Sequence, residues 1–360
     1  MKISCSLCIL LGLSGGAISA QDYPEAEISN GASHAKLYLP DAERGSYRGT
    51  RFDWSGIVTS LQYGGHEYFG QWYEHHDPKI HDAITGPVEE FRTNEAGLGY
   101  GEAQAGGTFI RIGVGVVRKP EEKAYRPFNT YEIVDPGERT LRKGKNWIEF
   151  GHRLGPSNGY AYDYRKTVRL TKGKPQLVLE HVLKNTGSKT IETEIYDHNF
   201  FVIDREVVGP EMAIRFPFVP KPAAQLKNGG EVRGQEIAYT RDLQKGESVF
   251  SEIQGFGDSA KDYDIRIENR KSGAGVRIVG DRPLVKVVFW SIRTVACPEP
   301  YIRLRIEPGQ DAKWKIVYDF YTFQAASRTT PRDASVFFLR ASASRAARSA
   351  VVAGPIDRIP

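Results

Sequence analysis

The chain has 360 residues, of which 40% are hydrophobic and 11% aromatic, and its 49 basic and 44 acidic residues leave a formal net charge of +5. So small an excess, with no dense run of Lys and Arg beside aromatic residues, argues against nucleic acid as a partner. Abundant Tyr, Phe, Gly and Pro are typical of many strands joined by tight turns and not of a helical bundle.

The first twenty residues have the pattern of a secretory signal peptide. Lys2 precedes an apolar stretch from Ile9 to Leu13, and small residues at 17–20 come just before Gln21. The segment is too short to span a membrane, and no later one holds the roughly 18 apolar residues that a transmembrane helix needs. We therefore expect a signal peptide at 1–20 and a secreted or periplasmic protein with no membrane span.

Cysteine usage agrees with that compartment. Cys5 and Cys8 would leave with the signal peptide, so Cys297 would remain alone and no internal disulfide could form. An exported protein without disulfides fits a bacterial periplasm or secretion better than a small extracellular scaffold.

Strand patterns dominate the rest of the chain. Apolar residues alternate with Arg and Gly from Ile110 to Val116, which predicts one strand. Turn signatures rich in Gly, Pro and Asn separate further predicted strands, which start at Tyr160 and lie at 177–183, 191–201, 284–295, 301–306 and 314–323. Strands at such short spacing, with no helical pattern between them, predict antiparallel sheets packed face to face. We expect one large all-β sandwich at 21–326, followed by an Ala-, Ser- and Arg-rich C-terminal extension at 327–360.

Two segments hold residues suited to acid–base chemistry. Near the end of a predicted strand, alternation puts Tyr196, His198 and Phe200 on one face, although a core histidine held by a hydrogen bond is the simpler interpretation. Glu299 lies between two prolines, which donate no N–H, so we expect a stiff segment outside the ladder hydrogen bonds. Its simpler interpretation is a turn with a solvent-facing carboxylate.

A third cluster could supply metal ligands. Glu74-His75-His76-Asp77 with His81 has suitable side chains. Adjacent histidines on an extended segment point to opposite sides, however, so we predict no metal site, and nothing in the sequence indicates a cofactor.

Together the first two segments resemble the aldose 1-epimerases, also called galactose mutarotases. Asp197-His198-Asn199-Phe200-Phe201 is similar to that family's N-H-x-Y-F strand. Cys297-Pro298-Glu299-Pro300, followed by Leu304 to Gly309, is similar to its C-x-E-P and L-x-P-G stretches, and Thr50 to Leu61 resembles its opening strands. The resemblance implies a galactose mutarotase-like antiparallel β-sandwich and a carbohydrate partner, either a monosaccharide or the end of a glycan.

The resemblance also implies an isomerase that interconverts sugar anomers, with His198 as general acid and Glu299 as general base. One group removes the proton of the anomeric hydroxyl while the other protonates the ring oxygen, so the ring opens and can close on its other face. The family's second histidine and hydroxyl-binding arginine have no match here. The candidates for substrate binding are Arg51, His75, His76, Glu90, Arg92 and Asn199.

Two other functions stay open at this point. One is a non-catalytic glycan-binding sandwich, because a fold does not imply an activity. The other is a polysaccharide lyase-like protein that acts on uronates with a Tyr or His base. Whether His198 and Glu299 face each other across a cleft about one sugar ring wide is the observation that bears most on this choice.

Overall fold

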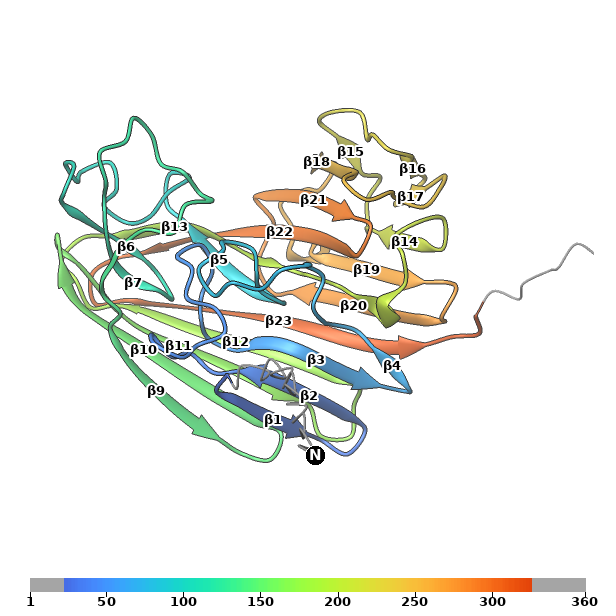
Figure 1. Ribbon diagram of the computed structural model, residues 1–360, viewed down its shortest axis with the longest axis horizontal. Coiled ribbons are helices and arrows are strands. Elements are labelled where there is room, and N and C mark those ends of the chain that lie inside the picture. Colours follow the sequence, from blue (N-terminus) through green and yellow to red (C-terminus); the bar gives the residue numbers. More distant parts are fainter. Residues whose placement is uncertain (1–22, 326–360) are drawn as a thin grey trace, which may run out of the picture. The chain divides into compact units, whose positions relative to one another are not determined.

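The computed structural model describes residues 23–325 (Figure 1). Within this range the regular structure is β-strand apart from two short 3-10 segments, Ile203–Arg205 (η1) and Ala260–Asp262 (η2), so the predicted all-β fold is confirmed. No helix in these residues is long and apolar enough to cross a membrane. The predicted signal peptide and C-terminal extension lie outside the described residues.

The largest sheet has ten strands, all paired antiparallel. The strands predicted from Tyr160, at 177–183 and at 314–323 are found near its middle. In spatial order its strands are Gly230–Arg233 (β16), Glu236–Tyr239 (β17), Met212–Arg215 (β14), Asp264–Asn269 (β19), Ala274–Gly280 (β20), Asp311–Thr322 (β23), Gln176–Asn185 (β12), Tyr160–Leu170 (β11), Trp147–Ser157 (β10) and Glu138–Lys143 (β9).

A second antiparallel sheet has six strands and contains the strands predicted near His198 and Glu299. In spatial order these are Lys221–Pro222 (β15), Ser248–Gln254 (β18), Lys286–Ile292 (β21), Val295–Ile306 (β22), Ile191–His198 (β13) and Val88–Arg92 (β5). Two smaller sheets complete the fold. One comprises Glu25–Ser29 (β1), Ser33–Tyr38 (β2), Ile57–Tyr63 (β3) and His66–Glu67 (β4), and the other Thr108–Arg111 (β6), Gly115–Arg118 (β7) and Ile133–Asp135 (β8).

The single strand predicted from Ile110 to Val116 is wrong, because this segment is the hairpin of β6 and β7. Arg111 pairs with Gly115 across the turn. Gly113 has φ of +82°, a conformation that side chains rarely adopt, and a Cβ there would lie 2.6 Å from Asp53. Of the glycines that looked like the polar half of an alternating strand, Gly113 is therefore a turn residue, and Gly115 begins β7.

One continuous hydrophobic core joins the ten-stranded sheet to the six-stranded sheet. Alternation along β12 buries Leu177, Leu179 and Leu183, and their cluster includes Ile195 and Leu304 of the six-stranded sheet. Each fully buried side chain of this kind stabilises the folded state by about 1.5–3 kcal/mol relative to an exposed one. Cys297 is a free, buried thiol.

Candidate active site

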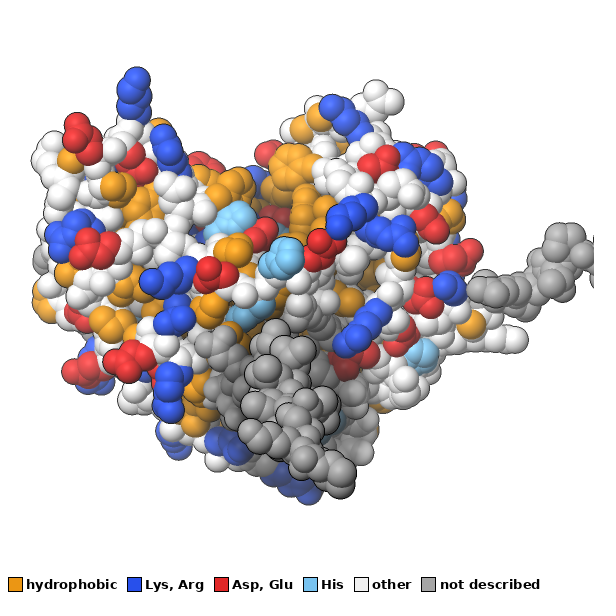
Figure 2. Space-filling model, in the orientation of Figure 1, with side chains coloured by type: hydrophobic (Ala, Val, Ile, Leu, Met, Phe, Trp, Pro, Cys, Tyr) orange, Lys and Arg blue, Asp and Glu red, His pale blue; other side chains and the backbone are white. Residues whose placement is uncertain are grey.

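A cavity of about 840 Å³ lies over one face of the six-stranded sheet. Glu299 pairs with Val288 and Tyr301 pairs with Tyr196, and residues opposite each other on neighbouring strands point to the same face. Alternate residues of β5, β13, β21, β22 and β18 therefore form the floor, and loop residues, among them Arg51, add walls. Figure 2 shows the hollow, with hydrophobic, acidic and histidine side chains gathered in it.

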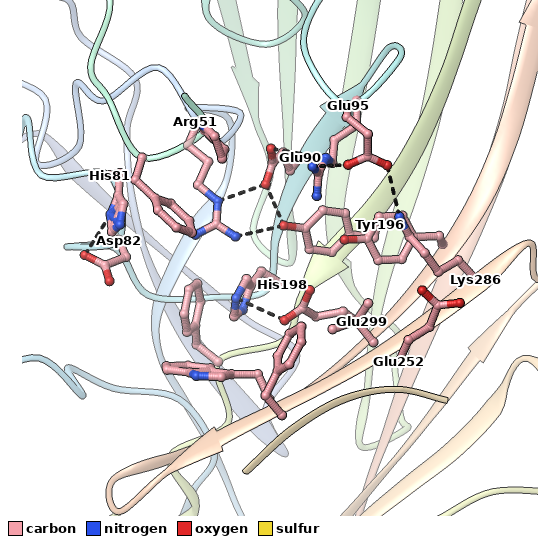
Figure 3. Close-up of a pocket in the computed structure, with 18 of the residues that line it drawn as sticks. Arg51, His81, Asp82, Glu90, Glu95, Tyr196, His198, Glu252, Lys286 and Glu299 are labelled. Atoms are coloured by element: carbon pink, nitrogen blue, oxygen red, sulfur yellow. Dashed lines mark hydrogen bonds and ion pairs between the residues drawn. The ribbon is translucent and has the colours of Figure 1, made fainter. Parts of the chain in front are cut away.

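His198 and Glu299 lie together on this floor (Figure 3). The Nε2 atom of His198 is 3.3 Å from Oε1 of Glu299, and the two side chains are 5% and 7% exposed. Their strands, β13 and β22, are neighbours in the sheet. The sequence left open whether these two residues face each other across a cleft about one sugar ring wide. In the structure their side chains are instead in direct contact.

The prolines beside Glu299 lie inside β22, so the predicted segment outside the ladder is wrong. β22 pairs with β21 from Val295 to Tyr301, but pairs with β13 only from Tyr301 onward. The carbonyl of Pro298 points away from β21, because it accepts a hydrogen bond from Asn199, and the proline nitrogen points to the same side. The missing N–H groups therefore cost no ladder hydrogen bond, and Glu299 is held between stiff neighbours.

Asn199, a predicted substrate-binding residue, is fully buried and does not line the cavity. Its Nδ2 donates to the carbonyl of Pro298 at 2.9 Å and to that of Asp197 at 3.2 Å, and its Oδ1 accepts from the Tyr318 hydroxyl at 2.8 Å. With its polar atoms used in this way, Asn199 ties the end of the strand that carries His198 to the strand that carries Glu299. It is a positioning residue.

Asn199→Ala is expected to lower the free energy of unfolding by about 1–3 kcal/mol, because it leaves the Pro298 carbonyl and the Tyr318 hydroxyl without this partner in a buried place. Urea unfolding provides the measurement. The exposed Asn129→Ala is the matched control and is expected to change little. Equal stability of the two variants would contradict the tie.

The imidazole of His198 lies among aromatic rings. It stacks on Phe200 with ring centroids 3.9 Å apart, and it meets Phe52 and Trp290 edge to face at 5.6 and 5.7 Å. Burial lowers the pKa of His198 well below its usual value, and the charge of Arg51 lowers it further. His198 is therefore neutral at pH 7.

Glu299 has the opposite shift. Burial raises its pKa to about 8; Arg51 opposes the rise and Glu90 adds to it. At pH 7 most molecules therefore carry a proton on Glu299. The contact pair is a neutral base beside a neutral acid.

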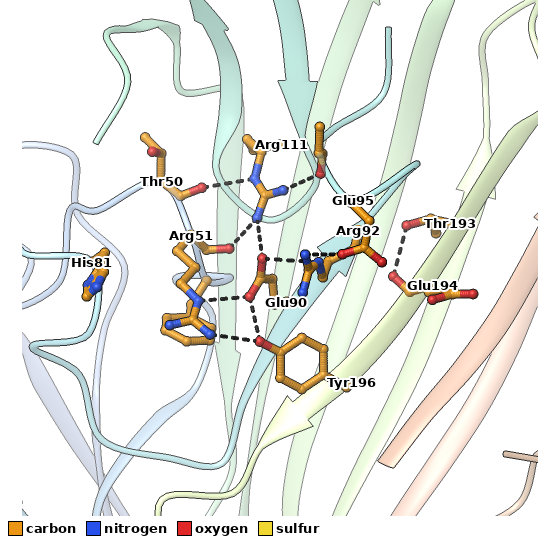
Figure 4. Close-up of polar contacts among 12 residues, drawn as sticks. Thr50, Arg51, His81, Glu90, Arg92, Glu95, Arg111, Thr193, Glu194 and Tyr196 are labelled. Carbon is orange, nitrogen blue, oxygen red and sulfur yellow. Dashed lines mark hydrogen bonds and ion pairs between the residues drawn. The ribbon is translucent and has the colours of Figure 1, made fainter. Parts of the chain in front are cut away.

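A charged network holds Arg51 in the cavity wall (Figure 4). Its Nε donates to Glu90 at 2.9 Å and its Nη2 donates to the Tyr196 hydroxyl at 3.0 Å, while that hydroxyl donates to Glu90 at 2.5 Å. Arg111, which does not line the cavity, donates from Nη2 to Oε1 of Glu90 at 3.3 Å. Burial would raise the pKa of Glu90, but Arg51, Arg111 and Arg92 lower it to about 2, so Glu90 stays ionised.

Of the predicted binding residues, Arg51, Glu90 and Arg92 line the cavity, whereas His75 and His76 do not. His75 is exposed, and the Nε2 of His76 lies 2.9 Å from the carbonyl of Ser46. Their loop contributes Trp72, His81 and Asp82 to the cavity lining instead. Among residues 23–325, no three His, Cys, Asp or Glu side chains are placed to hold a metal ion.

The fold matches solved structures of galactose mutarotase-like proteins. The Slr1438 protein from Synechocystis sp. PCC 6803 has a TM-score of 0.50 at 13% identity, over 85% of this chain and 99% of that one. A galactose mutarotase related enzyme from Lactobacillus acidophilus has a TM-score of 0.50 at 13% identity, over 83% of this chain and 97% of that one. A galactose mutarotase-like protein from Clostridium acetobutylicum has a TM-score of 0.51 at 12% identity, over 83% of this chain and 95% of that one. No family model and no curated protein sequence matches. The predicted mutarotase-like sandwich is confirmed, and likeness at this identity shows the fold alone.

Proposed function

We propose that this chain, which has the galactose mutarotase-like fold, is an aldose 1-epimerase-type enzyme that interconverts the anomers of a sugar. The observation that carries the proposal is the 3.3 Å approach of His198 to Glu299 on the floor of a cavity of about 840 Å³. O1 and O5 of an aldose are bonded to the same carbon. An acid and a base that must reach both oxygens therefore have to lie close together.

The reaction breaks and re-forms one bond. His198 takes the proton of the anomeric hydroxyl while Glu299 gives its proton to O5, so the C1–O5 electron pair stays on O5 and C1 becomes an aldehyde carbon. The aldehyde turns about C1–C2. O5 then attacks the other face as Glu299 takes its proton back and His198 returns its own to O1. The sugar leaves as the opposite anomer, and both side chains regain their starting protonation.

These roles are the reverse of those implied by the family resemblance, in which the histidine is the acid. An imidazolium at His198 would be buried among aromatic rings and repelled by Arg51, whereas burial favours the neutral acid at Glu299. The resting proton therefore belongs to Glu299.

The wall beside the pair suits a sugar ring. Trp72 stacks on Phe200 with ring centroids 5.1 Å apart, and Trp290 meets Trp72 edge to face at 5.5 Å. These rings offer apolar surface to the C–H faces of a sugar, while Arg51, fixed by Glu90, is a donor for a hydroxyl.

Anomer exchange measured by NMR, over a panel of hexoses, 6-deoxy sugars and uronates, tests this function. For an accepted sugar, kcat/KM is expected to hold near neutral pH and to fall above about pH 8, because Glu299 then loses the proton that it gives to O5. If kcat/KM instead rises as the pH passes about 8, Glu299 acts as the base. Unsaturated uronate absorbance would indicate a lyase, and saturable binding without exchange would indicate a glycan-binding protein.

A further inference from the structure

Two strongly exposed phenylalanines lie at the cavity. Phe128 is 63% and Phe250 61% exposed, more than any other large hydrophobic side chain in residues 23–325, and both line the same cavity as His198 and Glu299. The other exposed large hydrophobic side chains in this range are aliphatic and do not line this cavity, although Ile80 lies beside Phe128 in a neighbouring hollow. Exposed apolar surface gathered at one concave site points to a ligand that covers it.

Phe250 lies well away from the acid–base pair. It belongs to β18 and pairs with Trp290 of β21, which also lines the cavity, so its ring is on the cavity face. β21 lies between β18 and the strand of Glu299, which puts the two strands about 10 Å apart. A single pyranose ring bound with its C1 at Glu299 does not reach that far.

Phe128 reaches the cavity from the loop between β7 and β8. Its ring meets His81 edge to face with centroids 4.6 Å apart, and the guanidinium carbon of Arg51 is 5.3 Å from its centroid. Because Glu90 and Tyr196 fix Arg51, the ring has a defined position although it is exposed. Because this ring is held in place before a ligand binds, little conformational entropy is lost on binding.

Polar groups lie along the same face. Glu252 is two residues from Phe250 on β18, and the ammonium of Lys286 lies 4.2 Å from the ring centroid of Tyr301. Apolar platforms flanked by such groups match the C–H faces and hydroxyl rims of linked sugar rings. A volume of about 840 Å³ is near the upper end of the ~300–1,000 Å³ of ligand pockets and exceeds what one pyranose fills.

We propose that the cavity binds an oligosaccharide by its reducing end, with the terminal ring at His198 and Glu299 and the following rings packed on Phe250 and Phe128. The position of the terminal ring rests on the proposed function, whereas the aromatic platform does not. A second copy of this chain suits the site less well, because the two rings line a cleft and not a flat face.

Phe250→Ala tests the inference with matched sugars: glucose against maltotriose and cellotriose, galactose against β-1,4-galactotriose, and mannose against β-1,4-mannotriose. In the series that the wild type accepts, we expect a higher kcat/KM for the trisaccharide. Phe250→Ala is expected to lower that value about tenfold and to leave the value for the monosaccharide nearly unchanged. Leu141→Ala, an exposed site on β9 away from the cavity, is the matched control and is expected to change neither.

An equal effect of Phe250→Ala on both sugars of a pair, or no effect on either, would overturn the inference. The inference would also be overturned if analytical ultracentrifugation showed that the wild type is a dimer and that the Phe250→Ala variant is a monomer. If the wild type exchanges no anomer, calorimetry with the same sugars separates the two proposals. Trisaccharide binding weakened by Phe250→Ala would keep the inference without the epimerase, and an absence of trisaccharide binding would overturn it.

Discussion

Glu299→Gln is expected to lower kcat for anomer exchange by about 10²- to 10⁴-fold with little change in KM. The amide keeps the shape of the side chain but has no acidic proton to give to O5, so the C1–O5 bond would have to break toward an unprotonated alkoxide. That proton transfer takes place in the transition state, which is why binding of the sugar should change little. NMR exchange between anomers at pH 7 gives kcat and KM, and thermal unfolding checks the fold.

His198→Asn should slow the reaction to a similar extent, because it removes the base of the same step. The double variant is expected to be about as slow as either single variant, since an acid and a base that act together are not additive. The control is Glu192→Gln, an exposed glutamate on the same strand as His198 that pairs with Arg305. If the Glu299→Gln variant keeps the wild-type kcat, Glu299 does not transfer a proton in the reaction.

The sequence predicted much of the framework because strand alternation is a local property. β11, β12 and β23 follow apolar periodicity that can be read without knowing their partners. The hairpin of β6 and β7 was missed because Gly113 and Gly115 fall where an alternating strand would place small or polar residues. The positive φ of Gly113, and Asp53 lying where a Cβ of residue 113 would stand, identify it as a turn residue, and neither can be read from the alternation.

The candidate site was predicted in part. Strand order is not encoded locally, so the sequence did not predict that β13 pairs with β22. The link between His198 and Glu299 came from resemblance to a family and not from the residues themselves. Loop residues were harder to predict. His76 is held by the distant Ser46 carbonyl, a contact that no local pattern contains. Arg111 was hidden inside the mistaken strand.

Behind the cavity floor lies a fully buried ionic cluster. Glu89 is the neighbour of Glu90 on β5, and alternation turns it to the other face of the sheet. Its carboxylate pairs with the ammonium of Lys166, which also donates to the Ser55 carbonyl at 2.9 Å, and its Oε1 lies 2.7 Å from Nε2 of His181. The side chains of Glu89, Lys166 and His181 are all 0% exposed. Burial would raise the pKa of Glu89, but Lys166 and His181 lower it to about 2.

Glu89→Leu is expected to lower the free energy of unfolding by about 3–5 kcal/mol, because it leaves the Lys166 ammonium buried without its partner. The double variant Glu89→Leu/Lys166→Met should recover most of that loss, since an apolar pair of similar volume avoids the desolvation of both charges. Urea unfolding at pH 7 measures both variants. Because the pKa of Glu89 in the folded state lies below its ordinary value, the stabilisation from its charge is present above about pH 4.5 and is lost as the pH falls toward 2.

The exposed pair of Arg169 and Glu180 supplies the matched control. These two side chains are 3.0 Å apart but 41% and 45% exposed, so water screens them, and Glu180→Leu is expected to cost less than about 1 kcal/mol. If Glu89→Leu costs no more than Glu180→Leu, the buried charges do not stabilise the sheet. If Glu89→Leu costs several times more and the double variant does not recover, the cluster is needed as a hydrogen-bonded unit and not as a charge pair. Either result bears on the active site, because the strand that turns Glu89 inward also turns Glu90 toward Arg51.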